Sequence, residues 1–152
     1  MAPIKALVAA AVFAVLPIAS MAASTGPLHV QNNEPGTINL TSQSPGVCGS
    51  WISPISPGAP PASVAGSSTS GAFSLNVPTC SIGINVATAT YTFVSGELVS
   101  QCTYTITGNS PFSYSASGVT GCKILYTPDG IYFSFPNTVA ARVRPSQSTR
   151  SH

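Results

Sequence analysis

Charge is what this sequence most lacks. Only 5% of its 152 residues are charged, with 5 basic and 3 acidic side chains, whereas about a quarter of the residues of a typical soluble domain are charged. Because so few basic side chains cannot neutralise a run of phosphates, we expect no nucleic-acid partner. The near absence of charge also excludes a disordered tail that is kept open by charge repulsion.

The few titratable side chains form no recognisable catalytic or metal-binding pattern. A Ser-His-Asp site would have to use His29 and Asp129, but the sequence has no G-x-S-x-G motif. A glycosidase needs two carboxylates that flank the scissile bond, and Glu34 and Glu97 both lie beside turn residues, where we expect them to be solvated. Metal sites use clusters of His or Cys that are absent here. We therefore expect a protein that is not an enzyme and that uses no metal and no cofactor.

Residues 1–22 have the layout of a secretory signal peptide. Lys5 precedes an apolar stretch over 6–18, which is too short to cross a bilayer because a spanning helix needs roughly 20 residues. For the same reason, the stretch is too short to favour the alternative, a membrane anchor that is not cleaved. We expect cleavage after Ala22 and a secreted, extracellular mature chain, or a periplasmic one if the source is bacterial. No later segment is long and apolar enough to span a membrane.

The chain has only 4 cysteines, all of them after the expected leader. In an oxidising compartment an even number of cysteines predicts disulfides, here two. Four cysteines allow three connectivities, and the sequence alone does not choose among them. We favour Cys48 with Cys80 and Cys102 with Cys122, because each bridge then closes a short loop between neighbouring segments.

Alternation of apolar and polar residues dominates the second half of the chain and indicates strands with one buried face. This period of two, broken by turn sequences, predicts strands over 88–93, 101–107, 112–117, 122–126 and 131–135. Weaker signals predict strands over 28–31, 37–41, 73–77 and 81–86. Short strands at regular spacing predict an all-β fold, a single antiparallel β-sandwich or small barrel that two disulfides staple together.

The chain is expected to form one β-rich domain over residues 23–144. Within it, the stretch 51–71 is rich in Pro, Ser and Gly and has no period, so we expect a long surface loop. Residues 145–152 are polar and are expected to form an unordered tail. We expect no helix of useful length after the leader, and we interpret Arg142 and Arg144 as neighbours on one face of a last strand.

Two rows of threonine are the first binding candidates. A flat ladder of hydroxyl groups suits ice or a sugar polymer, although threonine is also a common residue on the solvent face of any sheet. The rows are Thr88, Thr90 and Thr92 on one expected strand, and Thr103, Thr105 and Thr107 on the next.

Exposed aromatic side chains are the second candidates. Trp51 and Tyr132 are the aromatic residues that we expect to act as surface anchors, although Trp51 would also fit as packing for a disulfide. Four other tyrosines lie on apolar rows and are expected in the core: Tyr91, Tyr104, Tyr114 and Tyr126. Asn39 begins an N-glycosylation sequon, which has meaning only in a host that glycosylates exported chains.

By elimination, these observations favour a small secreted, non-enzymatic protein that acts through surface contacts. It would be effector-like, or a component of a cell surface or extracellular matrix, with a protein or a polysaccharide as partner. The alternative is a carbohydrate-binding module that uses the exposed aromatics or the threonine rows. A formal net charge of only +2 also favours self-association.

Overall fold

The computed structural model of the chain describes residues 23–53, 60–78, 80–108 and 110–142. Over these residues the protein is all-β, with three mostly antiparallel sheets, none of which closes into a barrel. The expected all-β class is therefore confirmed, in the form of a sandwich. The expected leader over 1–22 and the expected tail over 145–152 lie outside the described residues.

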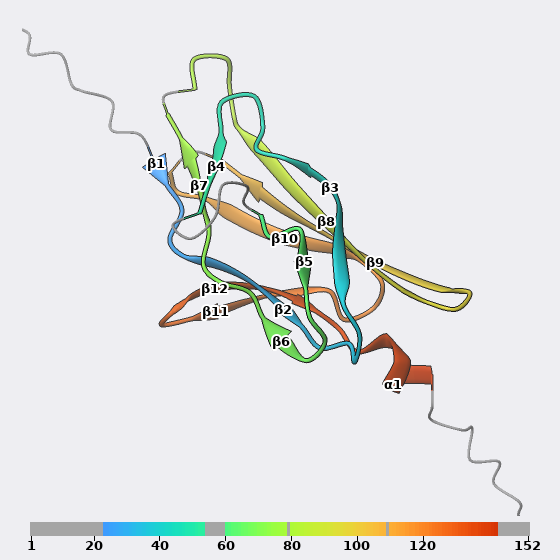
Figure 1. Cartoon of the computed structure of the whole chain (residues 1–152). Coiled ribbons are helices and arrows are strands. Elements are labelled where there is room, and N and C mark those ends of the chain that lie inside the picture. The colour runs from blue at the N-terminus through green and yellow to red at the C-terminus, as the bar shows by residue number, and fades with distance from the viewer. Residues whose placement is uncertain (1–22, 54–59, 79, 109, 143–152) are drawn as a thin grey trace, which may run out of the picture.

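The two larger sheets form the two layers of the sandwich (Figure 1). The five-stranded sheet has the order β10-β9-β8-β3-β5, with β3 at Ile38–Ser44, β5 at Ser63–Val64, β8 at Val86–Ser95, β9 at Leu98–Thr107 and β10 at Ser113–Gly118. The four-stranded sheet has the order β11-β12-β2-β6, with β2 at Leu28–Asn32, β6 at Ser68–Thr69, β11 at Lys123–Thr127 and β12 at Gly130–Phe135.

A smaller sheet completes the fold, with the order β1-β7-β4. Its strands are β1 at Ala23–Ser24, β4 at Ser50–Ile52 and β7 at Ser74–Val77. One short helix, α1 at Thr138–Arg142, follows the last strand. Arg142 therefore ends a helix, and its expected place on a last strand is wrong, while Arg144 lies outside the described residues.

The core lies between the two larger sheets. Tyr91 of β8 and Tyr104 of β9 are fully buried, as the alternation predicts. The ring of Tyr104 stacks on that of Phe133 from β12 in the opposite layer, with ring centroids 4.8 Å apart and an interplanar angle of 6°. This aromatic contact across the sandwich holds the layers in register, because aromatic pairs add to the gain from burial alone.

Some local expectations fail for tertiary reasons. Residues 81–85 form a loop and not a strand, because Gly83 takes a φ of 123° and Asn85 is buried in contacts to another loop. The stretch 51–71 contributes β5 and β6, short strands at the edges of the larger sheets. Tyr126 is 67% exposed and not in the core, because β11 is an edge strand.

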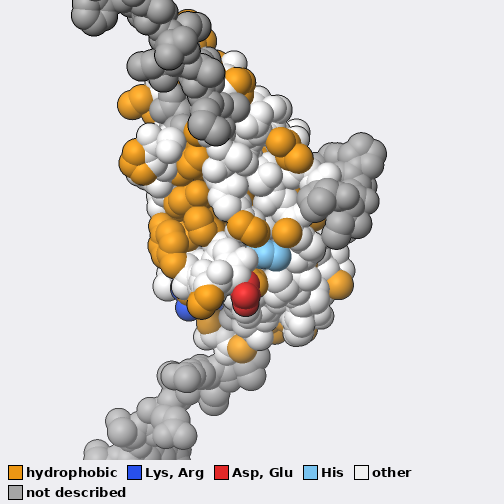
Figure 2. All heavy atoms as spheres, turned by 90° about the vertical axis from the view of Figure 1, so that its left-hand side faces the viewer, with side chains coloured by type: hydrophobic (Ala, Val, Ile, Leu, Met, Phe, Trp, Pro, Cys, Tyr) orange, Lys and Arg blue, Asp and Glu red, His pale blue; other side chains and the backbone are white. Residues whose placement is uncertain are grey.

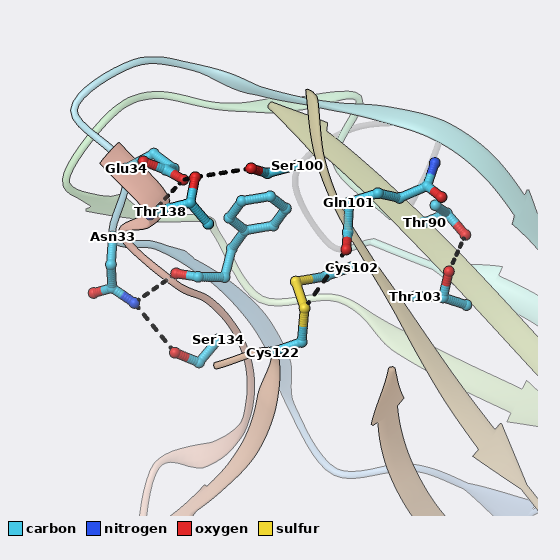
Figure 3. Close-up of a disulfide and its surroundings, with 11 residues drawn as sticks. Asn33, Glu34, Thr90, Ser100, Gln101, Cys102, Thr103, Cys122, Ser134 and Thr138 are labelled. Atoms are coloured by element: carbon cyan, nitrogen blue, oxygen red, sulfur yellow. Dashed lines mark hydrogen bonds between the residues drawn. A yellow bond between two sulfur atoms is a disulfide. The ribbon is translucent and has the colours of Figure 1, made fainter. Parts of the chain in front are cut away.

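The two disulfides have the connectivity that we favoured from the sequence, in which each bridge closes a short loop. Cys48–Cys80 joins the β3–β4 loop to the β7–β8 loop. Cys102–Cys122 joins the buried strand β9 to the residue before β11, so it links the two layers of the sandwich (Figure 3). Disulfides persist in oxidising compartments, which is typical of an extracellular protein.

The two buried tyrosines of the central hairpin differ in their hydrogen bonding. The hydroxyl of Tyr91 donates to the carbonyl oxygen of Pro61 at 2.7 Å, whereas the hydroxyl of Tyr104 has no partner among the described residues. Burial raises the pKa of both phenols well above the ordinary value, so both stay protonated. When the protein folds, the neutral hydroxyl of Tyr104 therefore loses its hydrogen bonds to water and gains none from the described residues of the protein.

This difference predicts opposite effects for two matched substitutions. Tyr104→Phe should leave the free energy of unfolding unchanged or raise it by up to about 1 kcal/mol, because it removes an unpaired buried hydroxyl. Tyr91→Phe should lower it by about 1 kcal/mol, because it leaves the Pro61 carbonyl without its donor. Urea denaturation of the two variants measures the difference, and an equal loss in both would contradict the assignment.

Candidate functional site

The register of the central hairpin brings the two predicted threonine rows together. Thr88 of β8 lies opposite Thr105 of β9, and Thr90 lies opposite Thr103. Thr92 faces Gln101, and Thr107 faces Val86. Residues directly opposite each other in an antiparallel pair project from the same face. The threonines therefore share the outer face of the five-stranded sheet, since Ala89 and Tyr91 between them point into the core.

Serines of the two flanking strands extend this surface on both sides. On β10, Ser113, Ser115 and Ser117 pair with the β9 threonines. On β3, Ser42 pairs with Thr90, and Ser44 pairs with Thr88. We call the whole surface the hydroxyl face: Ser42, Ser44, Thr88, Thr90, Thr92, Thr103, Thr105, Thr107, Ser113, Ser115 and Ser117.

The hydroxyl face carries no charged side chain, and part of it is prearranged. The hydroxyls of Thr90 and Thr103 lie 2.9 Å apart, within hydrogen-bond distance (Figure 3). Thr92 contacts the hydroxyl of Thr41 at 2.9 Å. In the part of the chain that the structure describes, Thr105 and Thr107 have no hydrogen-bond partner for their side chains, so these hydroxyls are free to donate and to accept.

The spacing of the hydroxyls suits an extended polar ligand. Neighbouring strands are about 4.8 Å apart, and alternate residues of one strand are about 6.7 Å apart. Each hydroxyl both donates and accepts, so the array can pair with a ligand that carries many hydroxyls of its own. Neighbouring strands are also rotated by roughly 20–25° relative to one another. That twist suits a flexible polymer better than the planar lattice of ice.

Trp51 is held by the protein itself. It lies on β4, half-buried, and its ring contacts Phe73 edge-on with centroids 6.0 Å apart. Its indole nitrogen donates to Oε1 of Gln43 at 2.6 Å. Both the apolar body and the single donor of this side chain are therefore engaged within the protein.

Tyr132 lies on the outer face of the four-stranded sheet and is also partly covered. Its ring stacks on that of His29, with centroids 4.7 Å apart and an interplanar angle of 19°. Nδ1 of His29 lies 3.2 Å from the carbonyl oxygen of Ser70, an acceptor, so this nitrogen carries the proton of that hydrogen bond. One ring face of Tyr132 is thus unavailable to a ligand.

Shallow polar hollows flank this pair on the same sheet. One hollow, of about 330 Å³, lies where Gln31, Asn33 and Ser134 meet Lys123 and Leu125 of the edge strand. A second, of about 170 Å³, lies between β2 and β6. Figure 2 shows the side of the molecule at the left of Figure 1: uncharged polar and backbone atoms dominate, and hydrophobic side chains gather along one flank.

Of the three acidic residues, Glu34 is buried and the other two lie in exposed turns. The expectation that Glu34 is solvated is wrong, because its side chain is fully buried. Its carboxylate accepts hydrogen bonds from the backbone N–H and the hydroxyl of Thr138 at the start of α1 (Figure 3). Glu97 is exposed in the β8–β9 turn, and Asp129 is exposed in the β11–β12 turn. Among the described residues no cluster of His, Cys, Asp and Glu is suited to hold a metal ion.

Asn39, the residue of the glycosylation sequon, is exposed on β3 and pairs with Thr92 of β8. Its side chain therefore lies at the border of the hydroxyl face, where a glycan would cover part of that face. Within the described ranges, no helix is both long enough and apolar enough to cross a membrane.

Comparison with known proteins assigns no family. No family model, no curated protein and no solved structure matches this chain.

Proposed function

We propose that this protein is exported and acts without catalysis, as a binding protein of a cell surface or extracellular matrix. Its contact surface is the hydroxyl face, and its partner is a polysaccharide rich in hydroxyl groups. The observation that carries this proposal is the alignment of Ser and Thr side chains across four neighbouring strands, with no charge among them.

The chemistry of the face supports a neutral polymer as the ligand. A single hydrogen bond contributes only about 0.5–1.5 kcal/mol net, so a shallow surface gains affinity by making many of them in parallel. Without charges, the face offers no attraction specific to an anionic or cationic partner. Because many hydroxyls lie on adjacent strands, a linear polymer can contact several of them at once.

Export is supported by the sequence and by the disulfides. Residues 1–22 have the composition of a secretory leader, and two disulfides are typical of proteins in an oxidising compartment. A protein partner at the same surface is the second candidate, because the serines of the hydroxyl face are exposed. A carbohydrate-binding module that binds through aromatic side chains is less well supported. Trp51 is already hydrogen-bonded to Gln43, and one ring face of Tyr132 is covered by His29.

Retention on insoluble polysaccharides tests the proposal. The variant Thr105→Val, Thr107→Val, Ser113→Ala, Ser115→Ala removes four neighbouring hydroxyls with little change in volume. On the polysaccharide that binds the native protein, we expect the affinity of this variant to be lower by at least about tenfold, because four lost hydrogen bonds at about 0.5 kcal/mol or more each sum to about 2 kcal/mol or more.

The matched control is Thr37→Val, Thr120→Val, because both threonines are exposed outside the hydroxyl face. This control should bind as the native protein does. Equal loss of retention in the two variants, or no retention of the native protein on any neutral polysaccharide, would refute the proposed ligand. If the native protein binds no neutral polysaccharide but captures a cell-surface protein, and the variant without the four hydroxyls does not capture it, the partner of the hydroxyl face is a protein.

A further inference from the structure

The β3–β4 and β7–β8 loops meet at one end of the sandwich, at the top of Figure 1, and both loops carry exposed aliphatic residues. Val47 is 76% exposed, Ile82 75% and Ile84 67%. Val86, the first residue of β8, is 47% exposed. We call these four residues the apolar tip. Exposed apolar side chains that cluster are a sign of an interaction site, whereas single ones are common on any surface.

The two loops of the apolar tip are fixed to each other. The Cys48–Cys80 disulfide joins them covalently. The buried side chain of Asn85 joins them a second time, because it accepts from the backbone N–H of Cys48 at 3.0 Å and donates to the carbonyl of Pro45 at 2.9 Å. A Cβ at Gly46 would lie 2.3 Å from Oδ1 of Asn85, so only glycine fits there. The tip is therefore held in shape before any partner arrives.

We propose that the apolar tip inserts into the interface of a lipid bilayer and holds the protein on a membrane surface. Neither loop contains a charged residue, over 44–53 or over 78–87. Insertion of these loops therefore desolvates no charged side chain, and the gain comes from aliphatic surface that leaves water. Backbone groups of the β3–β4 loop are already bonded to Asn85, which lowers the cost of moving this loop out of water.

A bilayer fits this tip better than a second copy of the chain does. Binding surfaces for proteins favour Trp, Tyr and Arg at their centres, and the apolar tip has only Val and Ile. To be buried on binding, these exposed side chains need either the apolar interior of a bilayer or an apolar pocket on a partner. The hollows on the four-stranded sheet are lined mainly by amide and hydroxyl groups and offer no such pocket.

The opposite end of the central hairpin supplies a matched control. Val94 and Val99 face each other near the β8–β9 turn, and each is 61% exposed. Glu97 lies in that turn, and its carboxylate opposes insertion into a bilayer because a charge would have to leave water. Exposed aliphatic surface is thus present at both ends, but only the apolar tip is free of charge.

Sedimentation with vesicles of neutral phosphatidylcholine tests the proposal on the full disulfide-bonded protein. We expect the native protein to bind, and Ile82→Ser, Ile84→Ser to lower its partition coefficient by about tenfold or more, since two large aliphatic side chains are lost. Val94→Ser, Val99→Ser should bind as the native protein does. Changing the salt concentration should have little effect, because no charge of the tip contributes.

Three outcomes would overturn the proposal: no binding of the native protein to vesicles, equal loss in the two double variants, or binding that disappears at high salt. Self-association in the absence of lipid that Ile82→Ser, Ile84→Ser abolishes would instead assign the tip to a second copy. Thermal unfolding of both variants checks that they fold. The test does not depend on the polysaccharide proposal, because it changes no residue of the hydroxyl face.

Discussion

Removal of the Cys102–Cys122 disulfide should lower the free energy of unfolding by about 3 kcal/mol, because a bridge across a loop of this length restricts the unfolded chain by that amount. The bridge spans 20 residues and joins the buried strand β9 to the start of β11. Cys102 is fully buried, so Cys102→Ala, Cys122→Ala also leaves a small cavity. Urea denaturation of the double variant measures the loss.

The other disulfide provides the comparison. Cys48→Ala, Cys80→Ala opens a loop of 32 residues, which predicts a similar loss of about 4 kcal/mol from chain entropy. The two variants should differ in where protection from hydrogen exchange falls. We expect β10 and β11 to lose protection in the first variant, and the loops of the apolar tip to lose it in the second. Unchanged stability without Cys102–Cys122 would show that the bridge does not hold the layers together.

Replacement of Glu34 should have the second large effect. Glu34→Ala should lower the free energy of unfolding by roughly 3 kcal/mol, because each buried group left without a partner costs about 1–3 kcal/mol. The carboxylate accepts from the backbone N–H of Thr138 at 2.8 Å and from that of Val139 at 3.5 Å. These are unpaired donors of the first turn of α1, where a negative charge is also favourable.

Glu34→Gln is the matched control for shape. Its amide oxygen can replace one acceptor, but its NH₂ group faces backbone N–H donors, so its loss should be smaller than that of Glu34→Ala but measurable. Thr138→Val should also destabilise, because the Thr138 hydroxyl contacts both Glu34 and the hydroxyl of Ser100. Urea denaturation and loss of exchange protection at α1 report both effects. Native stability in Glu34→Ala would contradict a structural role for this carboxylate.

The strands of the second half were predictable from the sequence because each has one solvent-exposed face and one buried face. Alternation around Tyr91 and Tyr104 fixes which side chains point inward, whatever the neighbours are. The same rule failed over 81–85, where Ile82 and Ile84 also alternate with small or polar residues. There the backbone has no neighbouring strand, and a buried Asn85 takes the place of a core residue.

The candidate site was predictable in part. The threonine rows follow from the sequence, since a short turn between two strands brings them side by side in a hairpin. The serines of β10 also alternate with apolar residues, whereas Ser42 and Ser44 of β3 flank the polar Gln43. Alternation also does not say which strands become neighbours. The hydroxyl face therefore became visible only with the strand order β10-β9-β8-β3.

The role of Glu34 had no local signal at all. Its contact with Thr138 joins residues 104 positions apart, and a carboxylate beside turn residues looks solvated when only its neighbours in the chain are known. The apolar tip is a similar case, because the loops that carry Val47 and Ile82 are joined by the Cys48–Cys80 bridge and by the hydrogen bonds of Asn85.

The sequence by itself determined the all-β class, the inward rows of the central hairpin and the scarcity of groups for acid–base chemistry. Those properties depend on composition and on the two-residue period of a strand, both of which are local. Only the tertiary structure decided the strand order, the buried place of Glu34 and the surfaces at which distant residues meet. Those depend on pairing between segments far apart in the chain, and backbone hydrogen bonds form between any two strands alike, so packing of the whole core selects among the possible pairings.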